Sequence, residues 1–343
     1  MVWPLLNSHT HPHTAQPVLK EQSYSTLMTT NEQSEETMKN TAYAVVFGGV
    51  LAVGLPLNAV ALWVLVCRHR LKSSSSVFMS HLALSDILLV LSLPTRVYFF
   101  ATGNWPLSMH ACVIATMLFR NNIRSSSFFI TFISLDRLLA VVYPLRSRHL
   151  RTSANAWKTS IVTWILIVSL NIPESINYLK SMTKDQTINN TNSTNTINIT
   201  NTTNTTNTPN CFIFNGHNCP YIAYVQSGVI FALLGVNMAS TAMVSRILHS
   251  HLSNAALVKN KINVMLIFAM NLLMFIVFFL PFSIVLMLGV DPKTAICLAS
   301  VNCCVDPLLY YFSLDAFWKK KEGSDVEISL ARSNENKLEL RTQ

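Results

Sequence analysis

The chain has 343 residues, of which 50% are hydrophobic and only 12% are charged, and its mean hydropathy is +0.36. Soluble globular proteins carry roughly 25% charged residues, so this composition excludes a protein that meets water over most of its surface. The net charge of +9 would suit a nucleic-acid partner, but so apolar a chain argues against nucleic-acid binding.

Residues 1–40 are polar and show no helical or strand period. They contain no basic segment followed by an apolar one, so we expect no cleavable signal peptide. We predict that residues 1–40 form a flexible tail.

Seven stretches beyond the tail are long and apolar enough to cross a bilayer, which takes about 20 residues of helix. They are Thr41–Cys67, Val77–Phe100, Met109–Val142, Ser160–Tyr178, Tyr221–Val244, Val264–Val290 and Thr294–Phe312. Only helices and closed barrels satisfy the backbone in lipid. The predicted fold is therefore an all-α membrane protein, with a seven-transmembrane helix bundle over residues 41–312.

Basic residues between the predicted spans set the orientation, because loops rich in Lys and Arg stay in the cytoplasm. The loops on one side carry Arg68, Arg70, Lys72, Arg146, Arg148, Arg151, Lys259, Lys261, Lys319, Lys320 and Lys321. The short loops on the other side carry only Lys180, Lys184 and Lys293. We predict a multi-pass protein of the plasma membrane with an extracellular N-terminus and a cytoplasmic C-terminus.

The predicted extracellular loop over residues 179–218 is of low complexity and contains Asn-x-Ser/Thr sequons, which are acceptors for glycosylation only on the outer side. The sequons are Asn189, Asn192, Asn198, Asn201 and Asn204. A neutral Asn/Thr repeat that forms sequons by chance is the alternative interpretation.

Three of the seven cysteines lie on the predicted outer side, where an oxidising environment favours a disulfide. We expect Cys112, at the start of the third span, to pair with the loop. Cys211 is the preferred partner because Cys219 lies against Pro220 at the start of the fifth span, although pairing with Cys219 stays open.

The segment FSLDAFWKKK, after the seventh span, predicts a short amphipathic helix on the inner leaflet, with its lysines toward anionic lipid. Residues 313–343 are thus expected to form a cytoplasmic helix and tail.

The third span carries Arg120 and Arg124 on one helix face, because they are four residues apart. They lie about 12 and 18 Å along the helix from Cys112. Arg96 near the outer end of the second span faces the same region, and Glu174 is the nearby carboxylate. This positive surplus predicts an anionic ligand, a phosphate or carboxylate held by guanidinium groups. The alternative is that Glu174 neutralises one arginine while polar residues satisfy the other.

Motifs in five of the spans identify the chain as similar to a known family. They are GLPLNAVALWV, LALSD, SLDRLLAVVYPL, FFLPFS and DPLLYY, together with Cys112 and Trp164. In this order, over Thr41 to Lys321, they resemble the rhodopsin-like G-protein-coupled receptors. The resemblance implies a receptor, not an enzyme, that acts through heterotrimeric G proteins.

The resemblance also implies roles for individual residues. Arg137 is expected to contact the G protein, and its neighbour Asp136 to hold its guanidinium until the helices part. The expected switch elements are Phe275, Phe279, Pro281, Pro307 and Tyr310, the prolines acting as bends. The polar centre of the bundle, where the family places a sodium ion and waters, is expected to comprise Asn58, Asp86, Ser126, Asn302 and Asp306. No other cofactor is implied.

Three segments, SLPTRVYFFATGNWPL, HLRTSANAW and SVNCCVDPLLYYF, resemble the purinergic-like branch that includes the non-Edg lysophosphatidic acid receptors. In that branch the arginine matching Arg96 helps to bind a phosphate, whereas tyrosines are usual where Arg120 and Arg124 stand. Lys293 is the one candidate base from the sixth-to-seventh loop. We expect the ligand to be lysophosphatidic acid, bound by these four bases beside Glu174, with its acyl chain among spans four to six.

Two other interpretations remain. A receptor of the same fold for a nucleotide or small carboxylic acid would also use clustered arginines. A membrane transporter would show internal repeats and broken helices in matching halves, and the sequence shows neither.

Overall fold

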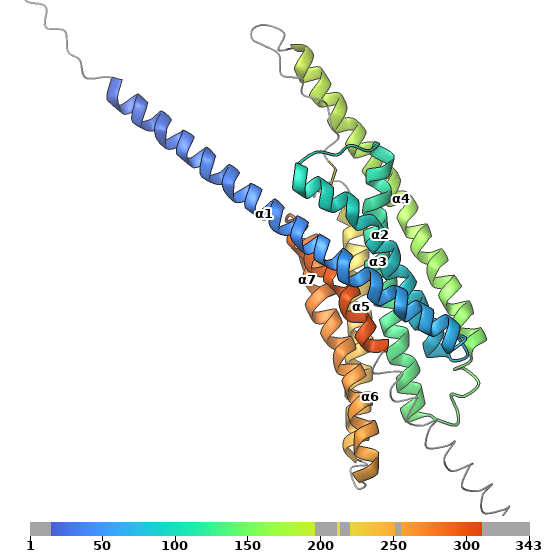
Figure 1. The fold of residues 1–343 in the computed structure, drawn as a ribbon. Helices are drawn as coiled ribbons and strands as arrows, with labels where there is room; N and C mark the ends of the chain where they lie inside the picture. The colour runs from blue at the N-terminus through green and yellow to red at the C-terminus, as the bar shows by residue number, and fades with distance from the viewer. Residues whose placement is uncertain (1–14, 196–210, 213–219, 251–254, 311–343) are drawn as a thin grey trace, which may run out of the picture.

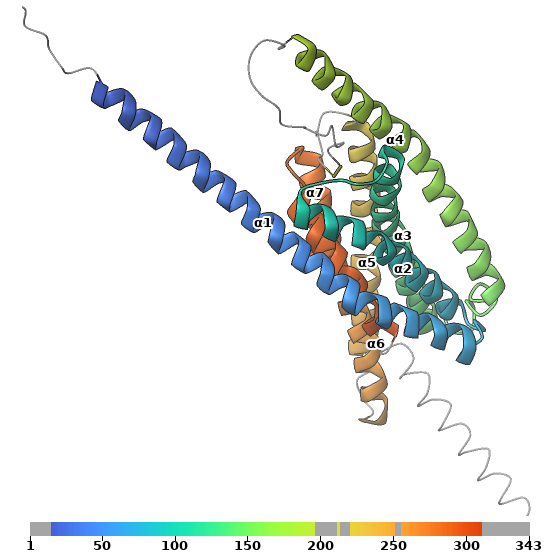
Figure 2. The same ribbon diagram turned by 45° about the horizontal axis from the view of Figure 1, so that its top comes forward.

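The computed structural model describes residues 15–195, 211–212, 220–250 and 255–310. These residues form a bundle of long helices (Figures 1 and 2). The elements are α1 (Ala15–Trp63), η1 (Val64–Arg68), α2 (Ser74–Thr102), α3 (Met109–Val142), α4 (Ser153–Asn195), α5 (Pro220–Ser250), α6 (Ala255–Met274), η2 (Phe275–Phe279) and α7 (Leu280–Leu288). A last helix covers residues 293–310.

Six segments of the described chain are long and apolar enough to span a membrane, and α6, η2 and α7 together make one of them. With the helix over 293–310 they confirm the predicted all-α, seven-helix architecture. The helix α3 is central, since it contacts α2, α4, α5 and α6.

Two predictions about chain organisation are wrong. The helix α1 starts at Ala15, so residues 15–40 are helical and not a flexible tail. Likewise α4 runs to Asn195, so residues 179–195 belong to a helix and not to a loop. Both segments extend beyond the neighbouring helices in the two views. Each segment continues an apolar span and lacks glycine. Residues 15–40 also contain many good helix formers, whereas residues 185–195 are mostly Asn, Thr and Ser, which are weaker ones.

Local sequence explains several helix ends near the sites described below. Ser73 and Ser108 cap α2 and α3, each accepting a hydrogen bond from a backbone N–H three residues on. Gly103 ends α2 with φ of 72°, a left-handed conformation that glycine adopts without strain. The π-helical turn η2 lies directly before Pro281, which lacks the N–H needed to continue a regular helix.

Candidate functional site

A disulfide joins Cys112 at the start of α3 to Cys211, with 5.8 Å between their Cα atoms, which confirms the preferred pairing. It places Phe212 over the side chain of Arg96, at 4.2 Å from the guanidinium carbon to the ring centroid. Cys219 lies outside the described residues.

Arg96, on α2, is buried, with 1% of its surface exposed. Its guanidinium carbon also lies 5.0 Å from the ring centre of Phe119 and 5.9 Å from that of Phe47. Its Nε and Nη2 atoms have no hydrogen-bond partner among the described residues. Aromatic faces attract a cation, but they do not replace the hydrogen bonds that a buried guanidinium needs. Arg96 is thus poised to receive an anion.

Arg120 and Arg124, on α3, both reach Glu174 on α4. Glu174 contacts Arg120 through Oε1, and its Oε2 accepts a hydrogen bond from Nη2 of Arg124 at 2.6 Å. Arg124 also donates to Asn171 on α4 and, over 2.8 Å, to Oε1 of Gln226 on α5. The predicted arginines and glutamate therefore form one network, in which Glu174 pairs with two arginines rather than one.

The sequence prediction missed the polar partners Asn171 and Gln226. Gln226 is a single long polar side chain in a span without charges, and Asn171 lies three residues before Glu174 on the same face. Both signals were available, because a buried amide in a membrane span needs a partner.

Lys293 lies apart from this network. Its ammonium group is 3.3 Å from the carboxylate of Asp291. It lines a cavity of about 340 Å³ with Lys39, Asn40, Tyr43 and other residues, and none of the three arginines lines that cavity. Lys293 is therefore not brought together with Arg96, Arg120 and Arg124 by the contacts that the structure records.

A second cavity, of about 440 Å³, lies between α3 and α4 beside the arginine network. Its lining is largely apolar and includes Met117, Leu118 and Ile176. Asn121, also in its wall, accepts a hydrogen bond from Asn171, the partner of Arg124. An apolar cavity thus lies next to the network of charged side chains, an arrangement suited to an amphiphilic ligand.

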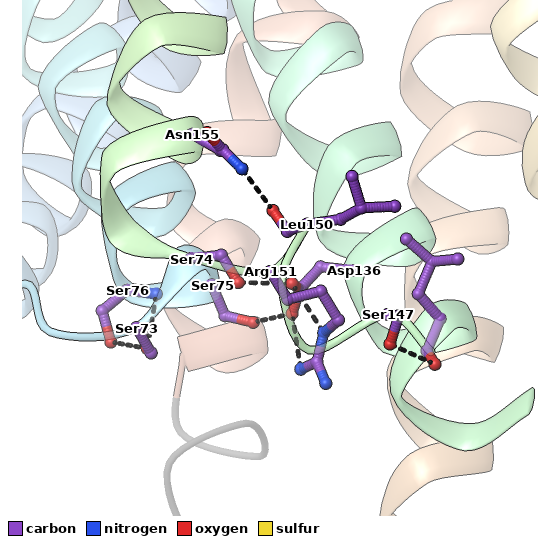
Figure 3. Close-up of polar contacts among 10 residues, drawn as sticks. Ser73, Ser74, Ser75, Ser76, Asp136, Ser147, Leu150, Arg151 and Asn155 are labelled. Carbon is purple, nitrogen blue, oxygen red and sulfur yellow. Dashed lines mark hydrogen bonds and ion pairs between the residues drawn. The ribbon is translucent and has the colours of Figure 1, made fainter. Parts of the chain in front are cut away.

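At the opposite end of α3, Asp136 accepts hydrogen bonds from Ser74 and Ser75 at the start of α2 (Figure 3). Arg151, in the connection between α3 and α4, donates to the same carboxylate from Nε at 3.0 Å and Nη2 at 3.2 Å. The expected contact with Arg137 is not among the recorded ion pairs of the described residues, where Asp136 pairs with Arg151. The charges of Asp136 and Arg137 still attract each other, although Arg151 supplies the recorded ion pair.

The predicted polar centre contains two interacting carboxyl groups, those of Asp86 and Asp306. Asn122, which the prediction missed, donates to Asp86 at 2.8 Å and to Ser126 at 3.3 Å. Asn302 donates to Asp306 at 2.7 Å. Asn58 instead donates to backbone carbonyls, including that of Cys303 at 2.7 Å.

Several buried oxygens in this centre lack hydrogen-bond partners within the described part of the chain. They are Oδ2 of Asp86, Oδ1 of Asp306 and the side-chain oxygens of Asn122, Asn302 and Asn58. Hard cations prefer oxygen ligands, and two buried carboxylates call for positive charge, so this donor set fits a sodium ion.

Among the expected switch residues, Phe275, Phe279 and Tyr310 are buried, whereas Pro281 and Pro307 are partly exposed. Phe275 and Phe279 lie in η2, with ring centroids 5.3 Å apart in edge-to-face contact. Tyr310 is buried and Pro307 lies inside the last helix. Of the sequons, Asn189 and Asn192 lie on the final turns of α4. Asn198, Asn201 and Asn204, like the segment 313–343, fall outside the described residues.

The sequence is similar to a known family and to several of its members. The profile of the family "7 transmembrane receptor (rhodopsin family)" matches residues 57–310. Lysophosphatidic acid receptor 6 of Mus musculus is 29% identical over 335 residues, which cover 90% of this chain and 93% of that receptor. Lysophosphatidic acid receptor 4 of Homo sapiens is 30% identical over 83% of this chain and 78% of its own length. Proteinase-activated receptor 1 of Bos taurus is 30% identical over 82% of this chain and 67% of its own length.

Proposed function

We propose that this chain, which belongs to the rhodopsin family of seven-transmembrane receptors, is a plasma-membrane receptor for lysophosphatidic acid that activates heterotrimeric G proteins. The main support for this ligand is Arg96, a buried guanidinium with two nitrogens that lack hydrogen-bond partners among the described residues. Phosphate oxygens match such a guanidinium in charge and geometry. The names of two similar receptors, lysophosphatidic acid receptors 4 and 6, support a phospholipid of this kind.

The head group of the ligand binds between Arg96 and Arg120 in this proposal. Arg120 follows Phe119, whose ring centre lies 5.0 Å from the guanidinium carbon of Arg96, so an anion between the two arginines relieves the repulsion of their charges. The acyl chain extends into the largely apolar cavity between α3 and α4. This position replaces the expected one among spans four to six, and Lys293 has no direct role in it.

The end of the bundle that carries the Cys112–Cys211 disulfide faces the outside, because disulfides persist in oxidising surroundings. The opposite end, with Arg137, faces the cytoplasm, in agreement with the basic residues of the connecting loops. Nε of Arg137 has no hydrogen-bond partner among the described residues, and in this proposal the guanidinium binds the G protein. Receptors of this family are not enzymes, and we propose no catalytic activity.

A sodium ion belongs to the proposal as a ligand of the polar centre around Asp86 and Asp306. It would neutralise one of two carboxylates whose residues are fully buried. Sodium should raise the thermal unfolding temperature of the purified receptor more than potassium does. An equal effect of the two ions, or a sodium effect that persists in Asp86→Asn, would contradict the proposed sodium site.

The test of the ligand is a G-protein activation assay on cells that express the full chain. Lysophosphatidic acid, a nucleoside diphosphate and a short-chain carboxylic acid are dosed in parallel, with untransfected cells as the control. We expect a saturable response to lysophosphatidic acid alone. A response to the nucleotide or the carboxylic acid, with none to the lipid, would contradict the proposed ligand and leave the receptor class intact.

A further inference from the structure

Glu174 bridges two arginines with separate oxygen atoms. Its Oε1 faces Arg120, and its Oε2 accepts from Arg124 at 2.6 Å. Because each arginine uses its own oxygen atom of Glu174, one contact does not require the other. The bond to Arg124 can persist when the contact with Arg120 is broken.

The two arginines differ in their surroundings. The side chain of Arg124 is 7% exposed, and it donates to Asn171 and Gln226 besides Glu174. The side chain of Arg120 is 12% exposed, and the ring centre of the preceding residue, Phe119, lies 5.0 Å from the guanidinium carbon of Arg96. Moving Arg124 would break contacts with α4 and α5, whereas an anion bound to Arg96 lies on the side of Arg120.

The charges of this cluster do not cancel. Arg96, Arg120 and Arg124 supply three positive charges, and Glu174 supplies one negative charge. The segments 1–14 and 196–219 contain no Asp or Glu, so they cannot add another carboxylate. Two positive charges are left, on the side of Arg96 and Arg120.

We propose that Glu174 is a tethered competitor for Arg120, which it holds without ligand and gives up to the ligand's phosphomonoester. This inference rests on the proposed function and assigns a role within the same site. The incoming phosphate takes Arg120 and Arg96, while Glu174 keeps Arg124. A phosphomonoester carries a charge of about −1.5 to −2 at neutral pH, which matches the two remaining positive charges. A carboxylate or phosphodiester carries one charge and leaves part of the surplus uncompensated.

The first test compares dose–response curves for lysophosphatidic acid at equal surface expression. Glu174→Gln removes the competitor and should lower the half-maximal concentration about tenfold, which corresponds to 1.4 kcal/mol. Arg124→Gln leaves Arg120 as the one arginine paired with Glu174 and should raise that concentration. The double variant Glu174→Gln/Arg124→Gln keeps the net charge and should lie near the intact receptor.

Glu36→Gln is the matched control, because it removes an exposed carboxylate from α1 rather than the buried carboxylate on α4. An unchanged or raised half-maximal concentration in Glu174→Gln would overturn the proposal. So would a double variant that fails to lie between the two single ones. If Glu174→Gln does not reach the surface, the double variant decides, since loss of potency there contradicts the charge argument. Equal potency of a phosphodiester analogue with the same acyl chain would overturn the preference for a dianion.

A second test separates this inference from the identity of the lipid. The purified receptor is unfolded thermally with and without inorganic phosphate, and with glycerol 3-phosphate, which lacks an acyl chain. Both should stabilise Glu174→Gln more than the intact receptor. Greater stabilisation of Glu174→Gln, without any cellular response to lysophosphatidic acid, would contradict the proposed lipid ligand and support the role of Glu174. Equal stabilisation of both proteins would overturn the role of Glu174.

Discussion

The two ends of α3 use charge in opposite ways. At the disulfide-bearing end, two arginines share the single carboxylate of Glu174. At the other end, the single carboxylate of Asp136 receives hydrogen bonds from three residues, Ser74, Ser75 and Arg151. A carboxylate that serves competing cations leaves positive charge available to a ligand. A carboxylate whose two oxygens are both occupied by donors is a fixed anchor.

The comparison suggests why one helix keeps four charged side chains in a membrane protein. Each charge would be costly in hydrocarbon, by roughly 2.5–3.5 kcal/mol on insertion scales. In the structure Arg124 and Asp136 are buried against named polar partners. Their networks join α3 to α4 and α5 at one end and to α2 at the other. The charges thus fix the central helix at both ends, and the surplus at each end is left for a partner.

Asp136→Ala is expected to have the largest effect, a fall in the thermal stability of the receptor. The substitution removes the acceptor shared by three residues and leaves Arg151 and Arg137 without a neutralising carboxylate. Loss of one partner from a buried pair costs about 3–5 kcal/mol. The thermal unfolding temperature of the purified receptor should fall further than in Glu174→Gln, where Arg124 keeps two other acceptors.

Asp291→Asn is the control for that measurement. Asp291 forms an ion pair with Lys293 but its side chain is 56% exposed, and exposed pairs contribute little stability. A smaller fall for Asp136→Ala than for Glu174→Gln would contradict the view of Asp136 as the anchor.

A smaller effect, on the maximal G-protein response, is expected from Arg151→Gln. This substitution removes one donor to Asp136 and leaves the carboxylate itself in place. Asp136 then lacks its cationic partner and competes with the G protein for Arg137. If Arg137 spends half of its time with Asp136, the maximal response falls about twofold with little change in ligand potency. G-protein activation at saturating ligand measures this.

Arg148→Gln, which removes an exposed arginine from the same connection, should leave the maximal response unchanged. A shift in potency with Arg151→Gln, and no fall in the maximum, would show that the two ends are not separate.

Sequence alone predicted what depends on length and composition. The limits Met109 and Val142 of α3 were predicted to the residue, because an apolar run of this length has a clear beginning and end. The preferred disulfide was also right. Residues 15–40 and 179–195 were missed because helices that protrude from the bundle need no apolar face, and without one they have no hydrophobic period.

The candidate site was predicted as a set of residues but not as a set of contacts. Arg120, Arg124 and Glu174 do meet, yet which oxygen serves which arginine depends on the rotation of α4 about its axis. The family resemblance implied that Asp136 interacts with Arg137, but it did not predict the other partners of Asp136. Ser74, Ser75 and Arg151 come from elements whose packing only the three-dimensional structure specifies.

The most direct test measures ligand binding and G-protein activation on the same preparations of Arg96→Gln and Arg137→Gln. Binding of labelled lysophosphatidic acid is measured without G protein, so that coupling does not alter affinity. Arg96→Gln should lose about 100-fold in affinity, together with activation, as expected for removal of a desolvated charged partner. Arg137→Gln should bind as the intact receptor does and fail to activate. Normal binding by Arg96→Gln, or loss of binding by Arg137→Gln, would contradict the division of α3 into a binding end and a coupling end.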